Sequence, residues 1–229
     1  ARRVHQEAPE EGSRAVTRDE LVADARHVAD AESDGRWPGP TIIRAADLVL
    51  RREWRNILNA NRNYRIARRT LTPTSAGLIA LSDLSSGTGD SAQVFYRVLG
   101  LSRGSVVYKE IDQMDVVVTA SGHGEQWGYQ SWCRAGDNLL VLPMNTDSVV
   151  VLVNHHPPLP SNLAGGSSTV VYPVGYEQIL TYEIAAMMLS KGGTETEASA
   201  QLKTFAEEWR RDMLEDIKRT STNATQIAY

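Results

Sequence analysis

The chain has 229 residues, of which 41% are hydrophobic and 23% charged, and its formal net charge is −4. This length and composition are those of a globular protein with room for one large domain or two small ones, and they exclude a disordered or fibrous chain. The negative net charge argues against a protein whose whole surface binds nucleic acid. The single cysteine excludes an intrachain disulfide. The apolar runs are too short to cross a membrane as helices.

The N-terminal region begins with a polar stretch. Residues 1–16 are mixed in charge and aperiodic, which predicts a flexible arm. Thr17 and Glu20 then have the spacing of a capping box, in which each side chain accepts a hydrogen bond at the start of a helix. A first helix is therefore expected here, and the residues expected to face inward are Leu21, Ala25 and Val28.

A second, longer helix follows a stiff turn. Pro38-Gly39-Pro40 marks the turn, and Thr41 is the expected cap of a helix that runs from Ile42 to about Asn59. The apolar residues recur at helical spacing, so one face is expected to be buried. This stripe comprises Ile43, Ala46, Leu50, Trp54 and Ile57.

In the middle of the chain the pattern of apolar residues changes from helical spacing to short strand-like runs. From Tyr64 to His156 the sequence is rich in β-branched residues, in short runs divided by Gly, Ser, Asn and Asp. Alternation over 126–134 predicts a half-buried strand, and residues 135–138 predict a hairpin turn after it. Seven or eight short strands at this spacing predict a small antiparallel sandwich or barrel. The candidate strands are Tyr64–Leu71, Leu78–Leu81, Val94–Leu101, Val106–Ile111, Val116–Ala120, Gln126–Arg134, Asn138–Leu142 and Val149–Val153.

The stretch Tyr172–Arg219 has the pattern of a helical hairpin. Pro173 is expected to start its first helix and Gly192-Gly193 to end it, and Thr194 with Glu197 forms a second capping box. The two apolar stripes comprise Tyr176, Ile179, Leu180, Ile184, Met187 and Met188 on the first helix and Leu202, Phe205, Trp209, Met213 and Ile217 on the second. Neither stripe can be buried by the other alone, so the hairpin needs a third layer.

The order of these elements predicts an α+β protein. Helices from both ends of the chain are expected to form one bundle, over residues 17–62 and 172–219, with an antiparallel β-sandwich or barrel inserted over residues 63–171. Residues 220–229 are polar and are expected to form a C-terminal arm. The expected core of the bundle contains Trp54, Ile179, Phe205 and Trp209.

The sequence has few signals of catalysis. Residues 122–128 are glycine-rich, but their spacing differs by one from a nucleotide loop, so a hairpin tip is favoured. His155 and His156 point to opposite sides of an extended chain and make a poor chelating pair. Ser121 and His123 with an aspartate suggest a small hydrolase only as a third hypothesis. We expect no catalytic residue, metal or cofactor.

The segment Arg51–Arg69, the arginine segment, is more informative. It holds seven arginines against one acid, Glu53, with Trp54 and Tyr64 between them. The forked guanidinium groups of arginine, with aromatic rings between them, can bind a phosphate backbone or an acidic protein surface. Two interpretations remain open: a binding surface, or a solvated helix face paired with acidic helices elsewhere. For a binding surface a protein partner is preferred because the net charge is negative, and a nucleic-acid-binding module is the alternative.

Four stretches together carry a resemblance to a known family. They are residues 46–54 (ADLVLRREW) leading into Asn63-Tyr64-Arg65, the β-rich middle, residues 173–180 (PVGYEQIL), and the sequence Phe205-Ala206-Glu207-Glu208-Trp209 in the last helix. In this combination, over most of residues 17–219, the chain resembles the head-to-tail adaptor proteins of tailed bacteriophages, also called connector or head-completion proteins.

This resemblance implies a structural role without catalysis. Such proteins form a ring, usually of twelve copies, in the neck of the virion, where it joins the portal protein to a tail or stopper protein. The ring surrounds a channel through which DNA passes without sequence readout, and it assembles in the host cytoplasm without any membrane. The residues expected to contact the portal or a neighbouring copy are Arg62, Arg65, Arg68 and Arg69, with Ile227 and Tyr229 in the C-terminal arm; this arm is either frayed or docks as an added strand.

Overall fold

The computed structural model describes residues 16–31, 37–112, 130–144, 146–190 and 196–226, and for residues 220–226 it describes the backbone alone. The chain divides into two compact units. The helical unit comprises Ala1–Leu50 and Leu159–Met213, and the sheet unit comprises Arg51–Pro158 and Leu214–Tyr229. Two of these three limits lie inside long helices and the third lies between Pro158 and Leu159, whereas the sequence predicted domain limits at residues 62 and 172.

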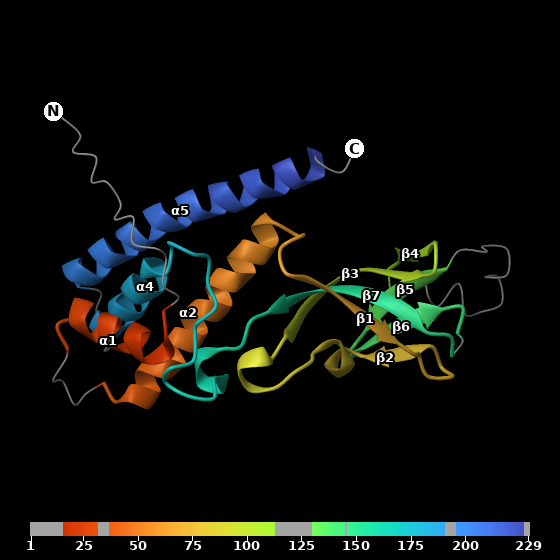
Figure 1. Ribbon diagram of the computed structural model, residues 1–229, viewed down its shortest axis with the longest axis horizontal. Helices are drawn as coiled ribbons and strands as arrows, with labels where there is room; N and C mark the ends of the chain where they lie inside the picture. The colour runs from red at the N-terminus through yellow and green to blue at the C-terminus, as the bar shows by residue number, and fades with distance from the viewer. Residues whose placement is uncertain (1–15, 32–36, 113–129, 145, 191–195, 227–229) are drawn as a thin grey trace. The chain divides into compact units, whose positions relative to one another are not determined.

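The fold is α+β, as predicted, with a sheet inserted between N-terminal and C-terminal helices (Figure 1). The helices are α1 (Arg18–Val28), α2 (Gly39–Ala60), α4 (Gln178–Leu189) and α5 (Glu197–Gln226), with short 3₁₀ turns η1 (Leu81–Leu84), η2 (Gly89–Ser91) and η5 (Pro160–Asn162). The strands are β1 (Ile66–Leu71), β2 (Leu78–Ala80), β3 (Val94–Arg103), β4 (Val106–Glu110), β5 (Ser131–Ala135), β6 (Asn138–Leu142) and β7 (Val149–His156).

In the helical unit, α1 begins with the predicted capping box. The Thr17 hydroxyl accepts a hydrogen bond from the Glu20 amide, and the Glu20 carboxylate accepts one from the Thr17 amide at 2.9 Å. Thr17 also forms an antiparallel bridge with Thr169, which ties the start of α1 to the segment that leads into α4. Helices α1 and α4 lie side by side (Figure 1).

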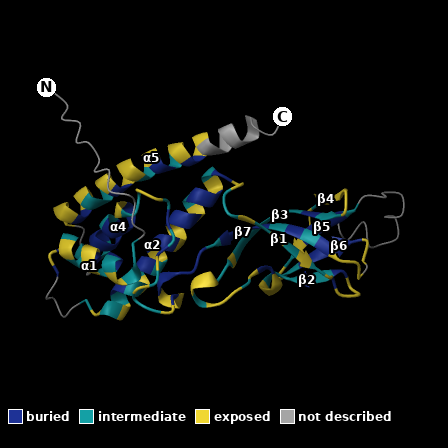
Figure 2. Ribbon diagram, in the orientation of Figure 1, coloured by how far each residue is buried: buried dark blue, intermediate teal, exposed yellow. Residues whose placement is uncertain are grey.

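Helix α4 is buried on nearly all sides rather than along one stripe (Figure 2). The buried set includes Glu183 as well as apolar residues, and Glu183 forms an ion pair with Arg210 of α5. The prediction that Pro173 starts this helix is wrong. Pro173 instead begins a turn, in which the Tyr176 amide donates to its carbonyl and Gly175 has a φ of 86°, and the helix begins at Gln178.

Two other predicted helix starts also shift. Helix α2 begins at Gly39, because the amides of Thr41 and Ile42 donate to the Pro38 carbonyl, so Thr41 lies inside the helix and is not its cap. Helix α5 begins at Glu197, and the Thr196 hydroxyl accepts a hydrogen bond from the Ser199 amide at 3.1 Å. Thr196 therefore caps α5 in the role predicted for Thr194, which lies outside the described residues.

Helix α5 buries Met213 and Ile217 of the predicted stripe, but not Phe205 and Trp209. Ser199, Ala206 and Met213, spaced by seven residues, are completely buried. Phe205 and Trp209, which were predicted to lie in the bundle core, are 49% and 38% exposed. Small residues let α5 approach α4 closely, since the Ser199 hydroxyl donates to the α4 carbonyl of Ala186, and this approach rotates the large aromatic residues outward. The other two predicted core residues, Trp54 and Ile179, are buried.

The sheet unit contains a seven-stranded sheet that curls into a half-barrel, in the order β1-β7-β3-β4-β5-β6-β2. All its neighbouring pairs are antiparallel except β4 and β5, which are parallel, so the predicted antiparallel sheet is in fact mixed. The pairing of β5 with β6 places Gly136, with a φ of 60°, in the predicted hairpin turn. The predicted strand Val116–Ala120 lies outside the described residues.

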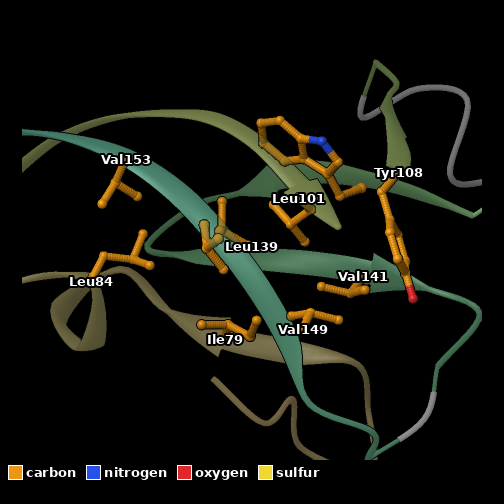
Figure 3. Close-up of a cluster of buried hydrophobic side chains, with 10 residues drawn as sticks. Ile79, Leu84, Leu101, Tyr108, Leu139, Val141, Val149 and Val153 are labelled. Carbon is orange, nitrogen blue, oxygen red and sulfur yellow. The ribbon is translucent and has the colours of Figure 1, made fainter. Parts of the chain in front are cut away.

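The concave side of the sheet holds the main apolar core. Side chains from η1 and from six strands meet there (Figure 3). Strand β5 does not show the predicted alternation, because Trp132 joins this core while Cys133 joins a second apolar cluster with Leu140 and Leu142. Both faces of β5 are therefore covered, and its buried residues form a continuous run. The main core comprises Ile79, Leu84, Leu101, Tyr108, Trp132, Leu139, Val141, Val149, Val151 and Val153.

Candidate binding surfaces

The arginine segment runs from the second half of α2 through a turn into β1. Glu53 and Trp54, its one acid and its tryptophan, are buried, while Arg51, Arg52 and Arg55 on the same helix are exposed. The acid therefore adds no negative charge to the outer surface, and the exposed side of the segment is formed mainly by guanidinium groups.

Two asparagine side chains hold the turn between α2 and β1. The Asn61 side chain accepts a hydrogen bond from the Asn63 amide at 2.9 Å. The Asn154 side chain of β7 is completely buried and donates to the carbonyls of Arg62 and Tyr64, both at 2.9 Å. These bonds fix the backbone from which the arginines project, because buried polar groups keep such partners.

Two of the four predicted contact arginines are occupied within the unit. Arg65 lies over the ring of Trp54, with its guanidinium carbon 5.4 Å from the ring centroid, and burial lowers the pKa of its guanidinium. Arg69 donates hydrogen bonds to the side chains of Ser86 and Gln93. Both residues stabilise the turn and β1, and neither is available to a partner as a free cation.

The other two, Arg62 and Arg68, are exposed, as are Arg51 and Arg55. In the part of the chain that the structure describes, no carboxylate pairs with these four side chains. These four arginines therefore have no carboxylate partner among the described residues, and we call them the free arginines.

His156, at the end of β7, lies next to this surface. Its ring meets that of Tyr96 edge-on, with 4.8 Å between the centroids. Burial, together with the positive charges of Arg51 and Arg55, lowers the pKa of its imidazole to about 4. His156 is therefore neutral at physiological pH, and the positive charge of the surface comes from arginine.

A second candidate surface lies in the helical unit. Phe205 and Trp209 of α5 are one helical turn apart, and each faces a tyrosine: Tyr182 with 6.2 Å between ring centroids, and Tyr176 with 6.4 Å. We call these four residues the aromatic patch. Large aromatic groups gathered on a surface are typical of an interaction site. The patch was not predicted from the sequence, because Phe205 and Trp209 fit a stripe that was expected to be buried.

The remaining predicted residues lie outside the described part of the chain: Ser121, His123, Ile227 and Tyr229. Among the residues that the structure does describe, no group of three His, Cys, Asp or Glu side chains is placed to hold a metal ion. Nor does any described helix combine the length and the apolar character needed to cross a membrane. Comparison of the sequence with known protein families and with curated proteins gives no match.

Proposed function

We propose that this protein is a structural adaptor of a tailed-phage neck, whose copies form a ring that joins the portal to the tail and surrounds the DNA channel. The aromatic patch carries this proposal. A single copy leaves Phe205 and Trp209 exposed on a helix whose other face is well packed, so a second surface is needed to cover them.

The two surfaces differ in a way that favours a ring over a simple pair. One is aromatic and lies beside the exposed acids Glu207 and Glu208 of α5, while the other consists of the free arginines. An aromatic and acidic surface on one copy complements a basic surface on the next. Contacts between unlike surfaces are heterologous, and they close into a ring when the rotation between copies allows it.

The family resemblance and the element order support the same function. The stretches that resemble phage adaptors lie on α2, around the turn before β1, on the segment that leads into α4, and on α5. In this proposal the portal, a tail or stopper protein and passing DNA are the partners, and the role is geometric rather than catalytic.

Assembly is the direct test. Purified protein would be analysed by size-exclusion chromatography with light scattering, with and without a portal ring. We expect a ring-sized species, alone or on the portal, and its loss in the double variant Phe205→Glu, Trp209→Glu. Thr204→Glu, an exposed change on the same helix outside the patch, is the control and is expected to assemble. A wild-type protein that stays monomeric and does not bind the portal ring would overturn the proposal.

The free arginines also support a second candidate function, a nucleic-acid-binding module. It predicts that a single copy binds DNA and that the log–log salt slope falls by about 0.9 for each phosphate contact removed. Changing Arg51, Arg55, Arg62 and Arg68 to alanine should then flatten the slope, while Arg44→Ala in the helical unit should not. An unchanged slope in the quadruple variant removes this candidate.

A further inference from the structure

The sheet unit contains a cleft that shares only Arg62 with the surfaces used in the two proposed functions. Its volume is about 690 Å³, which is in the range of binding sites for small ligands and short peptides. All the lining residues belong to the sheet unit. They are Arg62, Asn63, Leu81, Phe95, Tyr96, Arg97, Val98, Leu99, Glu110, Trp132, Arg134 and Leu139.

The cleft exists because two neighbouring strands separate. Strand β3 pairs with β4 only over Leu101–Arg103, and β4 then turns to pair in parallel with β5 at Lys109 and Glu110. The isolated bridge between Ser86 and Gln93 occupies the start of the same edge of β3. Over 97–100 this edge therefore has no described strand beside it, although β7 pairs with the opposite edge.

The walls of the cleft are apolar at depth and polar at the rim. Trp132 and Leu139 belong to the buried core, and Phe95, Val98 and Leu81 above them are partly exposed. Five consecutive residues of β3, from Phe95 to Leu99, are half-buried without alternation, which shows that the strand lies along an opening and not under a covering layer.

Arginine dominates the charge of the cleft. Arg62, Arg97 and Arg134 line it against one acid, Glu110, and neither Glu110 nor any other described carboxylate pairs with them. Arg97 donates to the Leu58 carbonyl at 3.1 Å, lies over Tyr96, and has a buried Nε without a hydrogen-bond partner. Arg62 and Arg134 are exposed at the rim. The cleft therefore favours a ligand with carboxylates.

The edge of β3 over 97–100, beside which the described residues place no strand, decides between an acidic peptide and a nucleic acid. Backbone amides and carbonyls along 97–100 match those of an extended peptide, as in strand addition, whereas a nucleic acid has no such repeating partners. Successive side chains of the peptide would point in turn to the apolar residues around Trp132 and to the arginines at the rim.

We propose that this cleft binds an extended acidic peptide of a partner protein, which adds as a short strand to the edge of β3 over 97–100 and pairs its carboxylates with Arg62, Arg97 and Arg134. This inference does not depend on ring formation, because every residue involved lies in one unit of one chain.

The test is fluorescence anisotropy with labelled probes: an octapeptide of alternating glutamate and valine, its lysine–valine counterpart, and an eight-nucleotide single-stranded DNA. We expect the acidic peptide to bind at least about tenfold more tightly than the other two. Arg62→Glu with Arg134→Glu, both exposed, should weaken it at least tenfold. The matched control Arg68→Glu, exposed on β1 and outside the cleft, should change it less than twofold.

Strand addition has its own test. The same peptide with alternate backbone nitrogens methylated should bind at least about tenfold more weakly, because methylation removes the donors that pair with β3. No binding of the acidic peptide, equal binding of the lysine peptide, or tighter binding of the DNA would overturn the proposal. Equal binding of the methylated peptide would overturn strand addition.

Discussion

The two units present different groups on their surfaces. The helical unit buries α4 on nearly all sides but leaves Phe205 and Trp209 exposed on α5. The sheet unit covers both faces of β5 with apolar residues and leaves its four free arginines without a carboxylate in the described chain. One unit thus presents aromatic side chains beside exposed acids and the other presents positive charge, so in the proposed ring each surface would meet the other kind on a neighbouring copy.

The largest expected effect is on stability, and it differs between two tryptophans. Trp54 is 1% exposed and packs against Tyr64 and Arg65, so Trp54→Ala should lower the free energy of unfolding by about 3–5 kcal/mol. Trp209 is 38% exposed, and Trp209→Ala should cost only about 1 kcal/mol, the value of one aromatic pair. Urea denaturation followed by circular dichroism measures both; equal losses would mean that the aromatic patch is part of the core.

The next effect concerns the buried ion pair of the helical unit. Glu183 and Arg210 join α4 to α5 with side chains that are 7% and 16% exposed. Glu183→Ala should lower the free energy of unfolding by about 3 kcal/mol, because it removes one partner of a buried pair. The control is Glu215→Ala, which breaks an exposed pair with Arg219 and should cost no more than about 0.5 kcal/mol. Similar losses in both variants would contradict the burial of the first pair.

The sheet unit should lose stability in acid through His156. Its pKa is about 4 in the folded protein and 6.5 in the unfolded chain, so the unfolded state binds an extra proton as the pH falls from 6.5 to 4. Over that window the free energy of unfolding should fall by about 2–3 kcal/mol from this residue, then level off. Burial lowers the pKa of His155 as well, which adds to the loss.

Denaturation at a series of pH values measures this loss. His156→Gln cannot titrate, so its stability should depend less steeply on pH between 6.5 and 4 than that of the wild type. Parallel curves for the two proteins would show that His156 is solvated and not buried beside Tyr96.

The smallest expected effect is at the start of α1. Thr17→Ala removes the hydroxyl that accepts from the Glu20 amide and should lower the free energy of unfolding by about 1 kcal/mol. Thr17→Ser keeps the hydroxyl and should restore most of the loss. Thermal unfolding of the three proteins measures the difference, and an unaffected alanine variant would mean that the bridge to Thr169 alone holds this segment.

Sequence patterns were most reliable where they depend on local chemistry. The capping box of Thr17 and the span of β6 at Asn138–Leu142 match their predictions, because a side-chain cap and a hairpin turn are determined by neighbouring residues. The buried face of α5 was predicted correctly at Met213 and Ile217 but wrongly at Phe205 and Trp209, since two stripes compete on that helix. The stripe with Ser199 and Ala206 is buried because small residues fit against α4. The spacing of apolar residues along one helix does not show the side-chain sizes of the helix that packs against it.

The candidate surfaces were predicted only in part. The arginine segment could be found by counting charges, but the engagement of Arg65 by Trp54 and of Arg69 by Ser86 depends on the folded turn and sheet. The cleft could not be predicted at all. It results from the separation of β3 and β4, a tertiary feature that strand patterns do not contain.

The lone cysteine offers a practical consequence. Cys133 is 2% exposed in the second apolar cluster, and burial raises the pKa of its thiol, so little reactive thiolate is present in the native protein. Brief exposure to a maleimide should therefore modify only molecules in which β5 has separated from its neighbouring strands. The labelling rate of the Cys133 sulfur would then report how often the sheet opens. The same inertness leaves the wild-type chain ready to carry spin labels or crosslinkers at introduced surface cysteines.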